Sequence, residues 1–357
     1  MTEPLRTGAR IGILGGGQLG RMLSVAAARL GFTTHVFDPA PNPPAGHVAD
    51  TVTTAGYDAI DALRAFARDV DVVTFEFENV PAEALDAIEA IVPIRPGRAS
   101  LATSQDRLAE KRFLEGLGLG TAPFAPVDDL AGLEAALGRI GTPAILKTRR
   151  LGYDGKGQVW IRADEEAPAA LEALAGAPAI LEGVVRFDRE VSVIAARAQD
   201  GAVVAFDPGE NLHEGGILRT TVVPSAMPAD LAADAVLIAG RILNALEHVG
   251  VMGVELFQAG RALFVNEIAP RVHNSGHWTQ NGCVIDQFEQ HIRAIAGWPL
   301  GDGRRFADVT MENLIGDDVR RIPEIARDPR AAIHLYGKAE VRPGRKMGHV
   351  NTVHARG

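Results

Sequence analysis

The first hundred residues alternate between short apolar runs and amphipathic segments. The apolar runs, which are typical of buried strands, occupy 10–16, 33–39, 70–80 and 92–96. Segments with the apolar spacing of helices occupy 18–31, 59–69 and 82–91. Strands that alternate with helices predict a parallel, doubly wound α/β sheet. Ligands of such sheets bind at the carboxyl ends of the strands, where Gly15–Gly20, Glu76 and Glu78 are expected.

The pattern changes after residue 100. One helix is expected over 104–120, with Ser104 as its N-cap. A small α+β unit follows, with strands at 143–150, 159–162 and 179–185 and a helix near 165–175. The rest of the chain is richer in strands, with hairpins at 189–206 and 250–270, a helix at 229–250 and strands within 331–353. We therefore expect an N-terminal domain, a small middle domain and a C-terminal mixed-sheet domain, at 1–106, 107–181 and 182–357.

Composition narrows the class of protein. The 357 residues are 46% hydrophobic and 23% charged, which is ordinary for a globular protein. The net charge of -9 argues against a nucleic-acid partner, which would need a broad basic face. The single cysteine, Cys283, cannot form an intrachain disulfide, and it is expected to pack in the core. The polar N-terminus and the shortness of the apolar runs predict a cytoplasmic protein without a membrane span.

A glycine-rich turn follows the first predicted strand. Gly15, Gly17 and Gly20 fit the G-x-G-x-x-G pattern of a dinucleotide-binding turn. Asp38 follows Gly20 by 18 residues, near the position of a ribose-binding acid. A nicotinamide dehydrogenase is one interpretation of this pattern. The turn would suit other phosphates as well, because a helix N-terminus attracts any such anion.

Two glutamates of the 250–270 hairpin are candidates for a metal site. Glu255 and Glu267 lie on strands joined by a tight turn at 259–261, so their side chains should be nearly opposite each other. Two carboxylates that meet among apolar residues are unfavourable unless a cation or a proton intervenes. Hard oxygen ligands suit magnesium, and Asn266 would add a third oxygen. The alternative is that one glutamate points outward or pairs with an arginine.

A second glycine loop follows a strand lysine. Lys147 ends an apolar strand, and a loop with Gly152, Gly155 and Gly157 follows. The spacing differs from a Walker A loop, because no Ser or Thr follows Lys156. A lid over phosphates is the functional interpretation, and an ordinary hairpin turn is the alternative.

Polar residues gather in two further segments. The loop after the second hairpin carries Arg271, His273, Asn274, Ser275 and His277, which indicate a cradle for an anionic substrate. Taken singly, either histidine is as well explained by a structural hydrogen bond. The turn near the C-terminus carries a basic cluster, which indicates a phosphate site or a solvated turn, at Lys338, Arg342, Arg345 and Lys346.

Together these features resemble the ATP-grasp superfamily. Lys147, the glycine loop, the strand 181–185, and Glu255 with Asn266 and Glu267 carry the resemblance. More narrowly, segments 152–158, 210–221, 266–282 and 340–349 are similar to the N5-carboxyaminoimidazole ribonucleotide synthetases of purine biosynthesis. The similarity extends from Gly12 to His349, and the run RVHNSGHWTQ is its most specific part.

The resemblance implies a fold and a reaction. The fold is an ATP-grasp fold with a doubly wound N-terminal domain, a small lid domain and a C-terminal mixed-sheet domain. ATP phosphorylates bicarbonate to carboxyphosphate, and the amine of 5-aminoimidazole ribonucleotide is carboxylated through carbon dioxide released in the closed site. The products are N5-carboxyaminoimidazole ribonucleotide, ADP and phosphate. ATP and Mg²⁺ are the implied cofactors, and a homodimer is the implied assembly.

The resemblance also implies how ATP and the metal are bound. Arg107 and Lys147 contact the phosphates, Glu182 accepts from the adenine amino group, and Glu190 holds the ribose. Magnesium is held by Glu255 and Glu267. The implied ATP-binding residues are Arg107, Lys147, Gly152, Tyr153, Asp154, Gly155, Lys156, Gly157, Gln158, Glu182, Gly183, Val184, Val185, Glu190, His213, Asn266 and Glu267.

For the ribonucleotide and bicarbonate, the resemblance implies a second set of residues. Arg271 stabilises the bicarbonate-derived anion, Asp154 orients the attacking amine, and His273 and Asn274 complete the catalytic group. The implied substrate-binding residues are Gly17, Gln18, Leu19, Glu76, Tyr153, Asp154, Arg271, His273, Asn274, Ser275, Lys338 and Arg345. The first glycine turn would then bind the ribose phosphate, with Glu76 at the ribose.

Some features leave alternatives open. At 206–211 this chain has FDPGEN, where many family members carry a Tyr-Pro pair, and the difference affects details around His213. Another ATP-grasp ligase, the nicotinamide dehydrogenase and a nucleotide-binding regulator without turnover are the competing hypotheses. The RVHNSGHWTQ loop disfavours another ATP-grasp ligase, and Glu255 with Glu267 disfavours the dehydrogenase.

Overall fold

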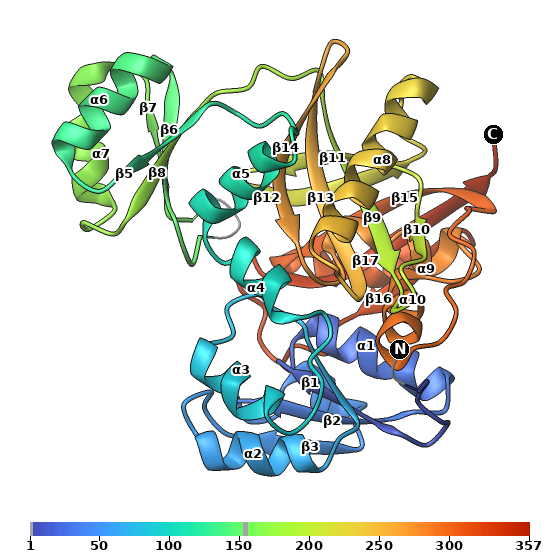
Figure 1. Cartoon of the computed structure of the whole chain (residues 1–357). Helices are drawn as coiled ribbons and strands as arrows, with labels where there is room; N and C mark the ends of the chain where they lie inside the picture. The colour runs from blue at the N-terminus through green and yellow to red at the C-terminus, as the bar shows by residue number, and fades with distance from the viewer. Residues whose placement is uncertain (1–2, 153–155) are drawn as a thin grey trace.

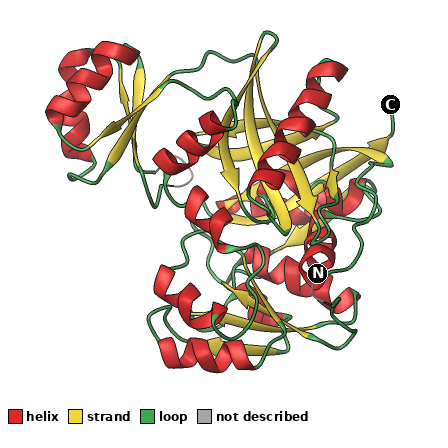
Figure 2. Cartoon of the chain, viewed as in Figure 1, coloured by secondary structure: helices red, strands yellow, loops and turns green. Residues whose placement is uncertain are grey.

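The computed structural model describes residues 3–152 and 156–357. Within these residues the strands form three sheets, two of four strands and one of nine. Figure 1 shows the N-terminal sheet at the bottom, the small middle sheet as a lobe at the upper left, and the large C-terminal sheet to the right of that lobe. Figure 2 shows that helices cover the two smaller sheets on their outer sides.

The N-terminal unit is a parallel sheet in the order β3-β2-β1-β4. Its elements are β1 (Arg10–Leu14), α1 (Gln18–Arg29), β2 (Thr33–Asp38), η1 (Pro44–His47), β3 (Thr51–Thr54), α2 (Ile60–Arg68), β4 (Val72–Phe75) and α3 (Ala82–Glu89). The central strand β1 is covered on both faces, and Ile11 and Ile13 are fully buried. The predicted doubly wound sheet is confirmed. The predicted strand 92–96 is reduced to a single bridge between Ile94 and Val73.

Two helices replace the single helix predicted over 104–120. They are α4 (Arg98–Ser104) and α5 (Arg107–Gly116). Asp106 has extended backbone, and its carboxylate accepts hydrogen bonds from the amides of Leu108 and Ala109. The N-cap of α5 is therefore Asp106 rather than Ser104, because a short acidic side chain satisfies the free amides of a first helical turn.

The middle sheet is antiparallel, in the order β5-β8-β6-β7. Its elements are β5 (Phe124–Val127), α6 (Leu130–Ile140), β6 (Ala144–Thr148), β7 (Gln158–Ile161), η2 (Asp164–Glu166), α7 (Ala167–Ala173) and β8 (Ala179–Gly183). Strand β8 continues past the predicted boundary at residue 181. Helix α5 does not join this unit, because Leu114 packs into the core beside the large sheet.

The large sheet follows the path β14-β13-β9-β11-β12-β15-β17-β16, with β10 paired to β9. Its strands are β9 (Arg189–Arg197), β10 (Val203–Ala205), β11 (Gly209–Glu214), β12 (Ile217–Val223), β13 (Gly250–Ala259), β14 (Ala262–Ala269), β15 (Ala307–Ile315), β16 (Ala331–Leu335) and β17 (Lys346–Ala355). Its helices are α8 (Ala229–Ala245), η3 (Asn274–Gly276), α9 (Thr279–Gly282), α10 (Gln287–Ala296), η4 (Gly316–Arg321) and α11 (Ile322–Ile325). Both predicted hairpins form.

The prediction for 229–250 was too long, because α8 ends at Ala245 and Gly250 already begins β13. Strands β3, β5, β11, β12 and β15 were not predicted. Strand β11 contains glycine and charged residues, which hide it from hydrophobic patterning. None of the helices in the described ranges combines the length and the apolar character needed to cross a bilayer.

Two buried histidines connect the N-terminal unit to the large sheet. His291 of α10 accepts from the amide of Val251 at 3.1 Å and contacts the Thr74 hydroxyl at 2.8 Å. His248 contacts the Ser100 hydroxyl at 2.9 Å and the Val251 carbonyl at 3.1 Å. Burial lowers the pKa of His291 to about 3 and that of His248 to about 4. Both rings are therefore neutral at pH 7.

These histidines predict destabilisation by acid. Their pKa values are lower in the folded than in the unfolded chain. The contribution of each neutral histidine to the free energy of unfolding is therefore fully present above the unfolded pKa near 6.5, and it is lost as the pH falls below that value. Between the unfolded and the folded pKa, each histidine lowers the free energy of unfolding by about 1.4 kcal/mol for every unit by which the pH falls. In urea titrations at pH 7.5 and 5.5, His291→Gln should therefore reduce the loss by about 1.4 kcal/mol relative to the unmodified chain. An unchanged pH dependence in that variant would contradict the assignment.

Candidate active site

A cleft of about 720 Å³ lies where the three units meet. Its walls come from the N-terminal loops, from α5 and β6, and from β11, β13 and β14. Fifteen of the predicted site residues among the described ones line it: Gln18, Leu19, Glu76, Arg107, Lys147, Gly152, Gln158, Glu190, His213, Glu255, Asn266, Glu267, Arg271, His273 and Asn274. Residues from all three units therefore share one cavity, as ligand sites between domains do.

Other predicted residues lie outside this lining or outside the described part. Tyr153, Asp154 and Gly155 fall outside the described residues. Those that the structure describes but does not place on the cleft wall are Gly17, Lys156, Gly157, Glu182, Gly183, Val184, Val185, Ser275, Lys338 and Arg345. Glu182 and Ser275 still contact residues of the wall, as described below.

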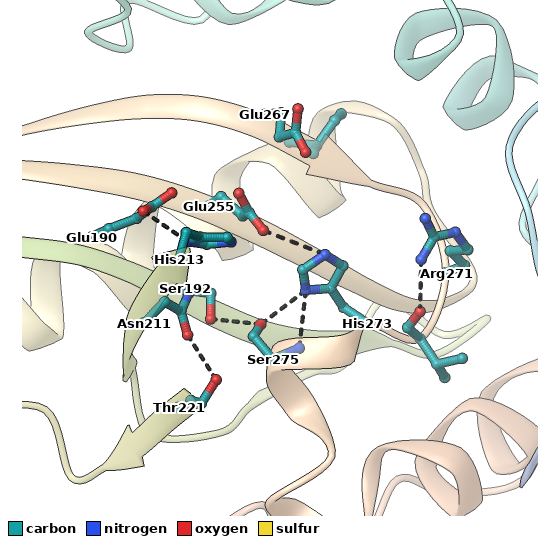
Figure 3. Close-up of polar contacts among 12 residues, drawn as sticks. Glu190, Ser192, Asn211, His213, Thr221, Glu255, Glu267, Arg271, His273 and Ser275 are labelled. Atoms are coloured by element: carbon teal, nitrogen blue, oxygen red, sulfur yellow. Dashed lines mark hydrogen bonds and ion pairs between the residues drawn. The ribbon is translucent and has the colours of Figure 1, made fainter. Parts of the chain in front are cut away.

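The two glutamates of the hairpin face each other, as predicted. Glu255 on β13 and Glu267 on β14 are directly paired residues, and Figure 3 shows their carboxylates on the same side of the hairpin. Glu267 also forms an ion pair with Arg107 at 3.0 Å, which is one of the alternatives noted from the sequence. Burial, and then the charge of Glu267, raise the pKa of Glu255 to about 8. Burial opposes ionisation of Glu267 too, but Arg107 lowers its pKa below the usual value.

This pair has the chemistry of a divalent-cation site. Both ligands are hard oxygen donors, and Asn266 of the same strand also lines the cleft. A bound cation would remove the repulsion that raises the pKa of Glu255. The donor set therefore fits Mg²⁺ shared with the phosphates of a nucleotide, for which two carboxylates suffice.

A buried network connects the middle sheet to α5. Lys147 on β6 donates to Glu182 on β8 at 2.9 Å, and Lys111 on α5 lies 3.8 Å from the same carboxylate oxygen. The other oxygen of Glu182 is buried and has no hydrogen-bond partner among the described residues. Glu182 thus has an acceptor available for a ligand that donates a hydrogen bond.

His273 lies at the centre of a chain of polar contacts (Figure 3). Its Nδ1 is 2.8 Å from the Ser275 hydroxyl oxygen, and Ser192 donates to that hydroxyl oxygen at 2.7 Å. Its Nε2 is 3.4 Å from Glu255. Burial, and then the charge of Arg271, lower the pKa of His273 to about 3. The neutral ring therefore helps to orient Glu255.

His213 of β11 and Glu190 of β9 also line the cleft, and the His213 Nδ1 lies 2.9 Å from the Glu190 carboxylate (Figure 3). Although burial opposes it, the hydrogen bond and the charge of Glu190 raise the pKa of His213. Asn274 lines the cleft as well, and neither polar atom of its side chain has a partner among the described residues. These groups are suited to bind polar ligands.

The structure gives a role to Glu78, which the sequence placed at a ligand-binding strand end but not among the site residues. Glu78, in the loop after β4, accepts from Arg271 through both carboxylate oxygens, at 2.7 and 3.2 Å. Although burial raises it, Arg271 lowers the pKa of Glu78 below the usual value. Its position two residues after Glu76, at the same strand end, was the available signal. Lys346, which also lines the cleft, was noted only as part of the basic turn.

The amides of the first glycine turn contact side chains of this chain. The amides of Gly17 and Gly20 both donate to the carboxylate of Glu76, the latter at 2.7 Å, and the amide of Gly16 donates to Asp38 at 2.7 Å. Side chains of this chain therefore already satisfy the turn that was expected to bind a ribose phosphate. The glycines are needed for close packing, since a Cβ on Gly17 would lie 2.5 Å from Glu76.

The basic turn lies between β16 and β17. Lys338 donates to the carbonyl of Lys346 at 2.8 Å, and Arg345 donates to the carbonyl of Glu340 at 3.1 Å. These bonds hold the turn beside Lys346, which reaches the cleft. Lys338 and Arg345 thus belong to the same turn as a cleft residue, but they do not line the cleft themselves.

Comparison with known families and proteins identifies the family of this chain. Family models match a ribonucleotide synthetase preATP-grasp domain at 8–105, an ATP-grasp domain at 112–288, and a phosphoribosylaminoimidazole carboxylase C-terminal domain at 310–356. An N5-carboxyaminoimidazole ribonucleotide synthase of Brucella melitensis is 52% identical over 355 residues, covering 99% of this chain and 98% of the relative. Its Pseudomonas aeruginosa counterpart is 45% identical over 344 residues, covering 95% and 93%.

Solved structures are similar over the whole chain. An N5-carboxyaminoimidazole ribonucleotide synthetase in complex with ADP is 39% identical, with a TM-score of 0.96 and coverage of 100% of this chain and 95% of that one. The Aspergillus clavatus synthase in complex with ADP and 5-aminoimidazole ribonucleotide is 32% identical, with a TM-score of 0.92 and coverage of 98% and 94%. The chain therefore belongs to the N5-carboxyaminoimidazole ribonucleotide synthases of the ATP-grasp superfamily.

Proposed function

We propose that this chain is the ligase that uses ATP and bicarbonate to convert 5-aminoimidazole ribonucleotide into N5-carboxyaminoimidazole ribonucleotide, ADP and phosphate. The observation that carries the proposal is the single cleft that joins two groups of residues. Lys147, Glu255 and Glu267 suit a nucleotide with its cation, and Arg271 and Asn274 suit an anionic second substrate. The similarity to a synthase solved with ADP and 5-aminoimidazole ribonucleotide supports both the nucleotide site and the site for the second substrate.

For ATP, we propose that Lys147 and Arg107 bind the phosphates, with Gly152 and Gln158 at the ends of the loop that covers them. The unpartnered oxygen of Glu182 accepts from the adenine amino group, next to Gly183, Val184 and Val185. Glu190 and His213, which line the cleft, hold the ribose side. Tyr153, Asp154 and Gly155 stay part of this proposal, together with Lys156 and Gly157.

Glu255 and Glu267, with Asn266, are the proposed holders of Mg²⁺. When bound, the ion would neutralise charge on the transferring phosphoryl group. His273 contacts the Glu255 carboxylate through its Nε2 and keeps that carboxylate oriented. Arg107, the first residue of α5, holds the Glu267 carboxylate through an ion pair.

For the second substrate, we propose that Arg271 stabilises the carboxyl group derived from bicarbonate. Glu78 fixes the Nε edge of its guanidinium, while Nη1 donates to the carbonyl of Val272. Asn274, with both polar atoms unpartnered among the described residues, binds the ribonucleotide, as do His273 and Ser275. Lys338 and Arg345 attract its phosphate, Gln18, Leu19 and Glu76 line the ribose end, and Asp154 orients the amine.

The reaction proceeds in two steps. A bicarbonate oxygen attacks the γ-phosphorus and ADP leaves, which forms carboxyphosphate. Its C–O bond to phosphate then breaks, releasing carbon dioxide and phosphate, and the amine nitrogen bonds to the carbon and loses a proton. Because carboxyphosphate reacts with water, the cleft must exclude solvent during both steps.

The competing hypotheses lose their support in the structure. A nicotinamide dehydrogenase would need free amides in the first glycine turn, and Glu76 and Asp38 accept from three of them. Membership of the synthase family also disfavours another ATP-grasp ligase and a regulator without turnover. We further propose that the protein is a cytoplasmic homodimer, which light scattering after gel filtration and cell fractionation would test.

The test of function is ADP release by the purified protein with ATP, Mg²⁺ and bicarbonate. Addition of 5-aminoimidazole ribonucleotide should stimulate release strongly, and N5-carboxyaminoimidazole ribonucleotide should form in equal amount. ADP release that is indifferent to the ribonucleotide would rule out the proposed substrate while leaving the ATP-grasp fold intact.

A further inference from the structure

Strand β14 contains an irregularity beside Glu267. Glu267 is paired with Glu255, but the next pair along the ladder is Val265 with Leu256. Asn266 is therefore an extra residue without a counterpart on β13, which is a β-bulge. Bulges change the direction of neighbouring side chains, and they leave backbone groups outside the ladder. The orientation of Glu267 thus depends on contacts that the sheet does not supply.

Helix α5 supplies those contacts on both sides of Glu267. Lys111 donates from Nζ to the carbonyl of Asn266 at 2.7 Å. The amide of Ile268 donates to the carboxylate of Glu110 at 3.3 Å. Arg107, on the preceding turn, binds the carboxylate of Glu267 itself at 3.0 Å. Positions i, i+3 and i+4 of one helix face therefore hold three consecutive residues of β14.

The burial of these groups indicates that they are not there for packing alone. Lys111 is 1% exposed and Glu110 is 4% exposed. Burying an amino group and a carboxyl group is costly unless specific partners compensate, and apolar side chains would fill the same space at lower cost. Lys111 lies 3.8 Å from Glu182 as well, so it also stands beside the proposed adenine contact.

We propose that Lys111 and Glu110 are positioning residues that fix the bulge at Asn266 and so aim the Glu267 carboxylate at the divalent cation. This inference rests on the metal role proposed for Glu267. Neither residue touches the substrates in this scheme, and both act through the backbone of β14. Outer-shell groups of this kind typically contribute about 10–100-fold to metal affinity or activity.

The experiment measures Mn²⁺ binding to the full chain saturated with ADP, by the electron paramagnetic resonance signal of free Mn²⁺. Lys111→Met and Glu110→Met should weaken Mn²⁺ binding by about 10–100-fold. Glu110→Gln retains an oxygen acceptor for the Ile268 amide, so its Mn²⁺ affinity should stay within about threefold of the unmodified chain. Arg112→Met, an exposed position on the same helix, is the matched control and should change nothing.

Thermal melting separates positioning from folding. Normal Mn²⁺ affinity in Lys111→Met and Glu110→Met, with a lowered melting temperature, would overturn the proposal and leave these residues a purely structural role. If Lys111→Met does not fold, the Mn²⁺ affinities of Glu110→Met and Glu110→Gln decide the question. Equal affinities in these two variants would overturn the proposal, and weaker binding in Glu110→Met alone would support it. Because the binding assay needs no ribonucleotide, a loss of Mn²⁺ affinity would uphold the inference even if the proposed carboxylation failed its own test.

Discussion

Replacing Glu267 by glutamine is expected to lower ribonucleotide-stimulated ADP release by about 10³-fold, roughly 4 kcal/mol in the barrier. Glutamine has nearly the same shape but lacks the charge, so it binds a divalent cation poorly. Glu267 is directly opposite Glu255 in the hairpin, and Arg107 also loses its anionic partner in this variant. The measurement is kcat for ADP release at saturating substrates and varied Mg²⁺.

Glu134→Gln, an exposed change on α6, is the matched control and should retain full activity. Circular dichroism and melting should show that Glu267→Gln is folded. ADP release within threefold of the unmodified chain would refute the assignment of Glu267 as a metal ligand. Glu255→Gln should give a loss of similar size, since Glu255 and Glu267 are paired across the hairpin and line the same cleft.

Replacing Arg271 by methionine is expected to reduce kcat by about 10²–10³-fold, because a group that stabilises developing negative charge is lost. Bicarbonate should no longer saturate the reaction at accessible concentrations. ADP binding should be unchanged, since the proposed nucleotide contacts come from other residues. Titration of bicarbonate in the ADP-release assay, together with calorimetric ADP binding, separates these effects.

Removal of Arg271 also leaves the carboxylate of Glu78 without its bidentate partner. The double variant Glu78→Gln/Arg271→Met controls for that unpaired charge, because it restores neutrality at the same place. If the double variant regained activity close to that of the unmodified chain, Arg271 would act only on Glu78, and the proposed anion role would be wrong. Loss of activity in both variants is the expected outcome.

Much of the candidate site was accessible to sequence reasoning because its residues follow local rules. Glu255 and Glu267 are placed by the length of one hairpin, which is a short-range property. Lys147 is placed by the end of a strand that precedes glycines. The contribution of Glu78 was harder to find, because its partner Arg271 is 193 residues away in the chain.

The sequence by itself determined the alternation of strands and helices, the two hairpins, and the chemistry of the RVHNSGHWTQ loop, because periodicity, turn residues and motif are local. Only the tertiary structure decided what the polar groups contact. It directed Glu76 into the first glycine turn, where a phosphate was expected, and it placed the buried charges of α5 beside the bulge at Asn266. Such pairings depend on how separate units pack, and the pattern of residues along one segment contains no information about them.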